Sequence, residues 1–175
     1  MLVGIFTLFP SNFFIDNTSA QYERNHNFVK YENPRFGYEI EYPAHWEFIP
    51  FPSSGSVLID YPPIIPPGGD AREVSTISIG VKNLTTPISL EKYTADYIES
   101  RLKDSNVTIE LSTITLRDDR IAHKVVVDLA DGTKIMAIWT IDRNQLYVIA
   151  YDGGRNYDLR LPIFEKMINS FRIYR

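Results

Sequence analysis

The stretch from Arg120 to Asp152 constrains the fold more than any other part of the sequence. It predicts three consecutive strands joined by tight turns at Asp131-Gly132 and Arg143-Asn144. An Asp-Gly pair is typical of a two-residue type I′ hairpin, because both central residues of that turn need positive φ. Arg143-Asn144 is a weaker signal for a second turn of the same kind.

The apolar residues of these strands fall on both faces of the expected sheet. One face carries Ile121, Val125, Val127, Ile135, Ala137, Trp139 and Ile141, and the other carries Val126, Met136, Ile138, Val148 and Ala150. A sheet that is apolar on both faces has to be covered on both faces. The stretch therefore predicts an α+β fold, an α-β-α sandwich with a central antiparallel sheet.

Two amphipathic helices are expected to provide that cover. The first begins at the N-cap Ser89, ends near Lys103 and has an apolar side made of Leu90, Tyr93, Thr94, Tyr97, Ile98 and Leu102. The second contains Leu161, Phe164, Met167, Ile168 and Phe171, with Pro162 in its first turn and its end near Ser170. We expect the two helices to roof the sheet and leave no hollow in which a reaction could run.

The N-terminal part of the chain predicts an opening β-hairpin. Tyr38–Tyr42 alternates apolar and acidic residues and ends at Pro43, and Trp46–Ile49 is expected to return along it. Residues 21–35 are interpreted as a lead-in with a short extended piece at 28–31. Residues 36–175 then form a single domain, in which residues 61–70 are a proline-stiffened loop.

Residues 1–20 resemble a secretory signal peptide. Residues 2–15 are mostly apolar and the small residues Thr18, Ser19 and Ala20 follow, although no basic residue precedes the apolar run. The prediction is an exported, extracytoplasmic protein that associates with membrane only through this segment if it is retained. The alternative is a cytoplasmic protein in which the segment packs on the domain.

Composition excludes some classes of function. The net charge of −4 argues against a nucleic-acid binder, which needs a basic face. The chain has no cysteine, which excludes disulfides and thiol nucleophiles.

No residue pattern points to catalysis, a cofactor or a metal, and we expect none of the three. Ser89 and Lys92 match the S-x-x-K motif of serine enzymes, but its companion motifs are absent and an N-cap explains Ser89. The histidines His26, His45 and His123 are far apart, and a hydrogen-bonded strand residue is the favoured interpretation of His123.

The candidate surface for a protein partner combines the hairpin tip with the proline-rich loop. Its residues are Pro43, His45, Tyr61, Pro62, Pro63, Ile64, Ile65 and Asp70. Apolar residues exposed in a loop mark partner sites, whereas a loop folded back over the sheet edge is the alternative.

Taken together, these segments resemble the PsbP/Mog1-type family, and PsbP-related proteins in particular. The resemblance spans roughly Tyr31 to Ile173. It rests on Phe36-Gly37, Tyr42-Pro43 and Trp46, the helix from Ser89, the Asp131-Gly132 meander and the closing segment 164–171.

The resemblance implies a binding or assembly protein without enzymatic activity. Plant and cyanobacterial members are extrinsic subunits of photosystem II, and Mog1-like members bind a small GTPase. A fold does not transfer a partner. Two alternatives stay open: a small-molecule-binding or enzymatic domain of cystatin or NTF2-like type, and a cytosolic GTPase-binding regulator.

Overall fold

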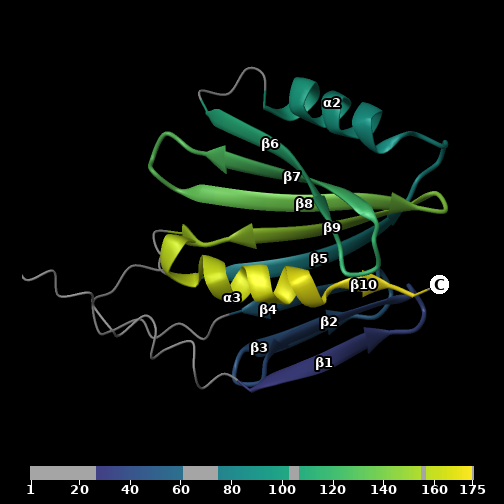
Figure 1. Ribbon diagram of the computed structural model, residues 1–175, viewed down its shortest axis with the longest axis vertical. Helices are drawn as coiled ribbons and strands as arrows, with labels where there is room; N and C mark the ends of the chain where they lie inside the picture. The colour runs from purple at the N-terminus through teal and green to yellow at the C-terminus, as the bar shows by residue number, and fades with distance from the viewer. Residues whose placement is uncertain (1–26, 61–74, 103–106, 155–156, 175) are drawn as a thin grey trace, which may run out of the picture.

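The computed structural model describes residues 27–60, 75–102, 107–154 and 157–174 (Figure 1). The predictions for residues 1–20 and for the whole 61–70 loop lie outside these ranges. The described strands are β1 (Phe28–Asn33), β2 (Tyr38–Pro43), β3 (Glu47–Phe51), β4 (Ser56–Asp60), β5 (Thr76–Asn83), β6 (Thr108–Thr115), β7 (Ile121–Asp128), β8 (Lys134–Asp142), β9 (Gln145–Asp152) and β10 (Arg172–Ile173). The helices are α2 (Leu90–Arg101) and α3 (Tyr157–Ser170).

Seven strands form the central antiparallel sheet, in the order β3-β4-β5-β9-β8-β7-β6. The predicted α+β class and central antiparallel sheet are confirmed, and the three strands predicted between Arg120 and Asp152 are β7, β8 and β9. Trp139 pairs with Val148, and Ala137 pairs with Ala150. Because directly paired residues share a face, Val148 and Ala150 lie on the Trp139 face, and their predicted assignment to the Met136 face was wrong.

Of the two turns predicted in the meander, the one at Arg143-Asn144 is a two-residue turn, and the one at Asp131-Gly132 is not. Arg143 and Asn144 have φ of 45° and 66° between the paired residues Asp142 and Gln145, so they form the two-residue type I′ turn. At the other turn, only Gly132 has positive φ, at 83°. There the Leu129 N–H donates to Thr133 O and the Gly132 N–H donates to Leu129 O. This is a three-residue loop, and the predicted two-residue turn was wrong.

Helix α2 covers one face of the central sheet. Ser89 is its N-cap and accepts a hydrogen bond from the Lys92 N–H at 3.2 Å, as predicted. Tyr93 and Tyr97 contact Trp139 with ring centroids 5.9 Å and 5.0 Å apart. These contacts form the smaller of two hydrophobic clusters, between α2 and the strands β7–β9.

Helix α3 lies on the opposite face, where the larger cluster forms. The Phe164 ring stacks on Tyr151 of β9 at 4.7 Å, and Met167 is fully buried. The helix ends at Ser170 as predicted, but it begins at Tyr157, so Pro162 lies inside the helix instead of in its first turn. Its side chain is exposed, which indicates that the ring points away from the sheet.

A second sheet of three strands, in the order β1-β2-β10, packs on the α3 side. Tyr38 of β2 is buried against Phe171 and Tyr147, at 5.7 Å and 6.4 Å between ring centroids. The extended piece expected at 28–31 is the six-residue strand β1.

The opening hairpin pairs differently from the prediction. Strand β2 pairs with β1, and β3 pairs with β4 in the other sheet, so the segment 46–49 does not return along Tyr38–Tyr42. The reversal before β2 is made by Gly37, which has φ of 66° and donates its N–H to Asn33 O at 2.7 Å. The segment from Pro43 to Trp46 therefore connects β2 of the small sheet to β3 of the central sheet.

Candidate functional site

A groove lies on the α3 side of the central sheet, with a volume of about 220 Å³. Figure 1 shows α3 running along β5 and β4, with β6–β8 farther toward the top of the view. The lining residues come from β6, β7, β8 and α3: Ile114, Thr115, Lys124, Met136, Ile138, Phe164, Glu165, Ile168 and Asn169. The prediction that the two helices would leave no hollow was therefore wrong at this side of the sheet.

The groove follows from the spacing of residues on the elements that build it. Lys124 lies between Ala122 and Val126 on the α3 side of β7, so a long cationic side chain stands between two apolar neighbours. On α3, the lining residues Phe164, Glu165, Ile168 and Asn169 share one side because they are one, four and five positions apart.

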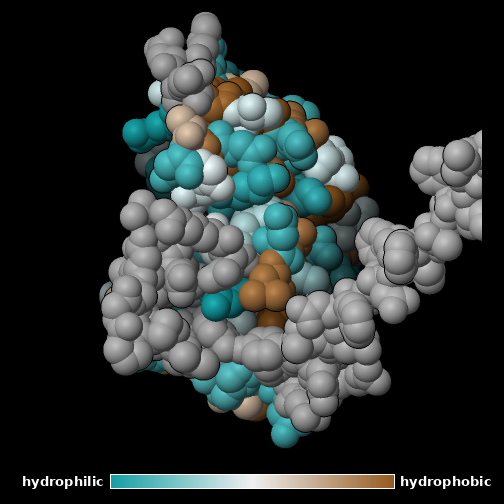
Figure 2. All heavy atoms as spheres, turned by 90° about the vertical axis from the view of Figure 1, so that its left-hand side faces the viewer, coloured by the Kyte–Doolittle hydropathy of each residue, from teal (hydrophilic) through white to brown (hydrophobic). Residues whose placement is uncertain are grey.

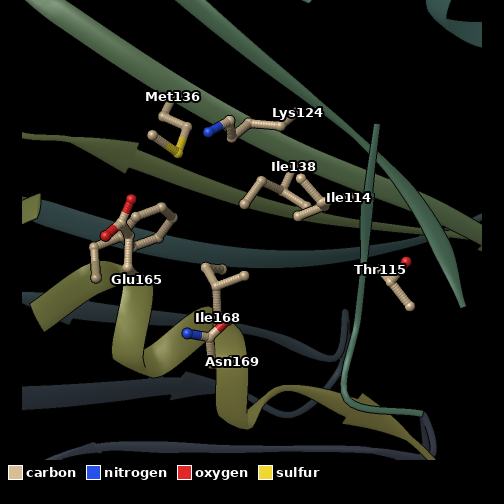
Figure 3. A pocket seen from close by; sticks show the side chains of 9 residues that line it. Ile114, Thr115, Lys124, Met136, Ile138, Glu165, Ile168 and Asn169 are labelled. Atoms are coloured by element: carbon tan, nitrogen blue, oxygen red, sulfur yellow. The ribbon is translucent and has the colours of Figure 1, made fainter. Parts of the chain in front are cut away.

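The groove combines an apolar floor with two opposite charges. Met136 and Ile138, which form the floor, are only 3% and 2% exposed. Figure 3 shows Lys124 reaching in from β7 and Glu165 from α3, over the apolar side chains. Such a surface suits a short protein segment that has an apolar side chain flanked by an acidic and a basic one.

The α2 side of the sheet contains a buried polar network instead of a groove. Thr94 Oγ lies 2.7 Å from His123 Nδ1, 2.7 Å from Trp139 Nε1 and 2.9 Å from Leu90 O. A hydroxyl carries one proton. All three contacts are hydrogen bonds only when Thr94 donates to Leu90 O and accepts from both His123 and Trp139. His123 is therefore the hydrogen-bonded strand histidine that the sequence favoured.

The core positions that a buried ligand pocket would use are filled. Trp139, Tyr147 and Phe164 are 2%, 1% and 0% exposed. The space between the sheet and the helices is thus occupied by aromatic side chains, and the groove opens only where α3 ends its cover of the sheet.

A buried carboxylate joins the three strands of the small sheet. Glu39 of β2 is 4% exposed and accepts from Arg172 Nε at 2.6 Å and Nη2 at 3.1 Å, and from Lys30 Nζ at 3.3 Å. The Arg172 hydrogen bonds, opposed by burial and aided by Lys30, hold the pKa of Glu39 below its usual range. These bonds join β10, β2 and β1, so the group has a structural role.

The predicted partner surface is only partly within the described residues. His45 is exposed and Pro43 is buried, whereas Tyr61, Pro62, Pro63, Ile64, Ile65 and Asp70 lie outside the described ranges. Sequence reasoning missed the groove. The available signal was Lys124, a cation in the middle of a strand whose neighbours on the same face are apolar.

Among the described residues, one further face and the side chains of metal-ligating types contrast with the groove. The coloured residues of the face in Figure 2 mix hydrophilic and hydrophobic side chains without one broad hydrophobic area. Within the described ranges, no three His, Cys, Asp or Glu side chains gather as metal ligands would. No helix in that part of the chain has the length and apolar character needed to cross a membrane.

Comparison with solved structures identifies the class of fold. CyanoP, the cyanobacterial PsbP of Synechocystis sp. PCC 6803, is similar with a TM-score of 0.57 and 15% identity over 85% of this chain and 94% of CyanoP. LpqN, described as involved in cell envelope biogenesis of Mycobacterium tuberculosis, has a TM-score of 0.57 and 16% identity over 89% of this chain and 96% of LpqN.

A third similar structure is PA94 of Pseudomonas aeruginosa, described as a protein of unknown function and putative regulator. Its TM-score is 0.56, with 11% identity over 85% of this chain and 98% of PA94. No protein-family model and no curated protein matches the sequence. At these identities the similarity establishes the fold. The chain has a PsbP/Mog1-like fold, as the sequence resemblance implied.

Proposed function

We propose that this protein is a non-enzymatic, extracytoplasmic binding or assembly module that holds a segment of a partner protein in the α3 groove. The observation that carries the proposal is the placement of Lys124 and Glu165 in one groove above an apolar floor. A partner segment placed there buries its own apolar side chain against Met136 and Ile138 and makes two charge contacts that fix its direction.

The remaining buried polar groups support a role in binding. Thr94, His123 and Trp139 satisfy one another, and Glu39 is held by Arg172 and Lys30. A catalytic group has to be able to reach a substrate, whereas these groups use their hydrogen bonds to join elements of the fold.

The extracytoplasmic location rests on the signal-like residues 1–20 and on LpqN, whose description places its role in the biogenesis of the cell envelope. Cell fractionation with mass spectrometry of the mature N-terminus tests it. A chain that begins near Gln21 in the exported fraction is expected. A soluble intracellular chain that keeps Met1 contradicts export and favours the cytosolic alternative.

Binding in the groove is tested by charge reversal. The Lys124→Glu variant is expected to reduce co-purification of the partner from native cells by at least tenfold relative to wild type, because it places two acidic groups across the floor. The Lys82→Glu variant is the matched control, since Lys82 is an exposed lysine on β5 outside the groove.

A partner bound equally by wild type and by both variants would show that the groove is not the binding site. Thermal unfolding of each variant separates lost binding from lost structure, because a folded Lys124→Glu protein that loses its partner has lost only the contact.

A further inference from the structure

The edge strand β6 carries one charged residue, Glu110, and otherwise lacks the features that usually protect the end of a sheet. Its sequence, Thr-Ile-Glu-Leu-Ser-Thr-Ile-Thr, contains no proline and no lysine. Within the described part of the chain it pairs only with β7, and most of its residues are exposed. The opposite edge, β3, is five residues long and contains Pro50. An exposed, unprotected edge strand presents unpaired backbone groups to another strand.

The register with β7 shows which backbone groups of β6 are available. The Leu116 N–H donates to Arg120 O, and these residues continue the β6–β7 register, in which Thr115 lies opposite Ile121. Backbone groups along an antiparallel strand alternate between its two sides. The even-numbered residues of β6 therefore face β7, and the odd-numbered residues Ile109, Leu111, Thr113 and Thr115 point their N–H and C=O groups away from the sheet.

We propose that β6 pairs with β6 of a second copy of this chain, in an antiparallel two-fold dimer centred on Leu111. A two-fold axis between antiparallel strands passes through a pair of equivalent residues, which is a hydrogen-bonded pair for the outward-facing, odd-numbered residues of β6 and a non-hydrogen-bonded pair for the even-numbered ones. Centring on Leu111 overlaps residues 108–114 of both strands. Centring on Ser112 would give an equally long overlap, 109–115, but it would place Glu110 opposite the apolar Ile114. Centring on Thr113 would overlap only 111–115.

The side chains of β6 are compatible with this register. Leu111 is 51% exposed and meets Leu111 of the second copy on the axis. Ile109 lies opposite Thr113 of the second copy, which is a favourable pair of β-branched residues. Glu110 lies opposite Ser112 of the second copy, so no two like charges are directly opposed.

The test compares Leu111 with a residue of equal exposure that is not on the edge. Ile121 of β7 is also 51% exposed and serves as the matched control. In sedimentation equilibrium over a range of concentrations, wild type and Ile121→Lys are expected to reach twice the monomer mass of 20.2 kDa. Leu111→Lys is expected to remain monomeric, because two lysines meet on the axis.

Disulfide cross-linking is a second test, and it does not require a variant with weakened self-association. The chain has no cysteine, so a single introduced thiol reports one position. Hydrogen-bonded antiparallel pairs have Cα atoms about 5.5 Å apart, within the disulfide range of about 4.4–6.8 Å. Leu111→Cys is therefore expected to form a covalent dimer on mild oxidation, and Ile121→Cys is expected to stay monomeric.

Two outcomes would overturn the inference. A wild-type chain that is monomeric at every concentration would show that β6 does not pair with a second copy, and a strand of another protein would then be the remaining candidate for this edge. A dimer that survives Leu111→Lys, with equal cross-linking of the two cysteine variants, would place the interface elsewhere. Thermal unfolding of Leu111→Lys establishes that the variant is folded.

Discussion

Thr94 joins α2 to the central sheet through one hydroxyl group. Replacing it with valine keeps the shape but leaves the N–H groups of His123 and Trp139 without an acceptor in a buried site. A buried unsatisfied polar group costs about 1–3 kcal/mol. Thr94→Val is therefore expected to lower the free energy of unfolding by about that amount in urea denaturation.

The control for this prediction is Thr94→Ser, which keeps the hydroxyl and removes only a methyl group. It is expected to retain most of the stability that valine loses. Equal stabilities of the serine and valine variants would show that the hydroxyl does not hold the helix in place.

Glu39 makes the stability of the fold depend on pH. Because the Arg172 hydrogen bonds lower its pKa in the folded protein, the folded state holds its proton less tightly than the unfolded state. Its stabilising contribution is complete above the unfolded-state pKa, about 4.3, and is lost as pH falls through the lower folded-state value. Glu39→Gln should thus be less stable than wild type at pH 7, and the gap should narrow in acid.

Urea denaturation at neutral and acidic pH measures that gap. Glu47→Gln, at an exposed position on β3, is the control and should follow wild type at both values. If the gap between wild type and Glu39→Gln is the same at both pH values, the Arg172 contact does not carry the effect.

Among the elements, the β8–β9 hairpin depends most on backbone conformation. Asn144 has φ of 66° and its Nδ2 donates to Leu84 O at 2.5 Å. Glycine accepts this backbone geometry, whereas a β-branched residue is strained there. Asn144→Val is expected to be less stable than Asn144→Gly by about 1–2 kcal/mol in thermal or chemical unfolding. Equal stabilities would mean that the turn rearranges without cost.

The helices and strands with a periodic apolar pattern were predictable from the sequence, whereas the pairing of one strand with another was less predictable. The N-cap at Ser89, the end of α3 and the β7–β9 meander follow from local patterns that tertiary contacts reinforce. The pairing of β2 with β1 depends on Gly37 and on long-range contacts of Tyr38, which strand propensity does not reveal.

The groove was also not predictable, because it depends on how separate elements pack together. Lys124 and Glu165 are 41 positions apart, and only the position of α3 on the sheet brings them to one groove. Sequence patterns identify which residues share a face of one element. They do not indicate where a helix stops covering the sheet, because that depends on the angle and position at which the helix packs.

At the scale of the whole molecule, the two faces of the sheet have different roles. The α2 face is sealed by aromatic contacts to Trp139, while the α3 face carries both the small sheet and the groove. The proposed partner site uses the α3 side of the molecule, and because Ile114 and Thr115 of β6 line the groove, the proposed β6 pairing lies directly beside it.

The most direct test of this account is site-specific photo-cross-linking in living cells, with the reactive residue placed at Asn169 in the groove or at Lys82 outside it. The account predicts a discrete adduct with one partner protein from position 169 and none from position 82. Adducts of equal yield from both positions, or none from position 169 in folded protein, would contradict it.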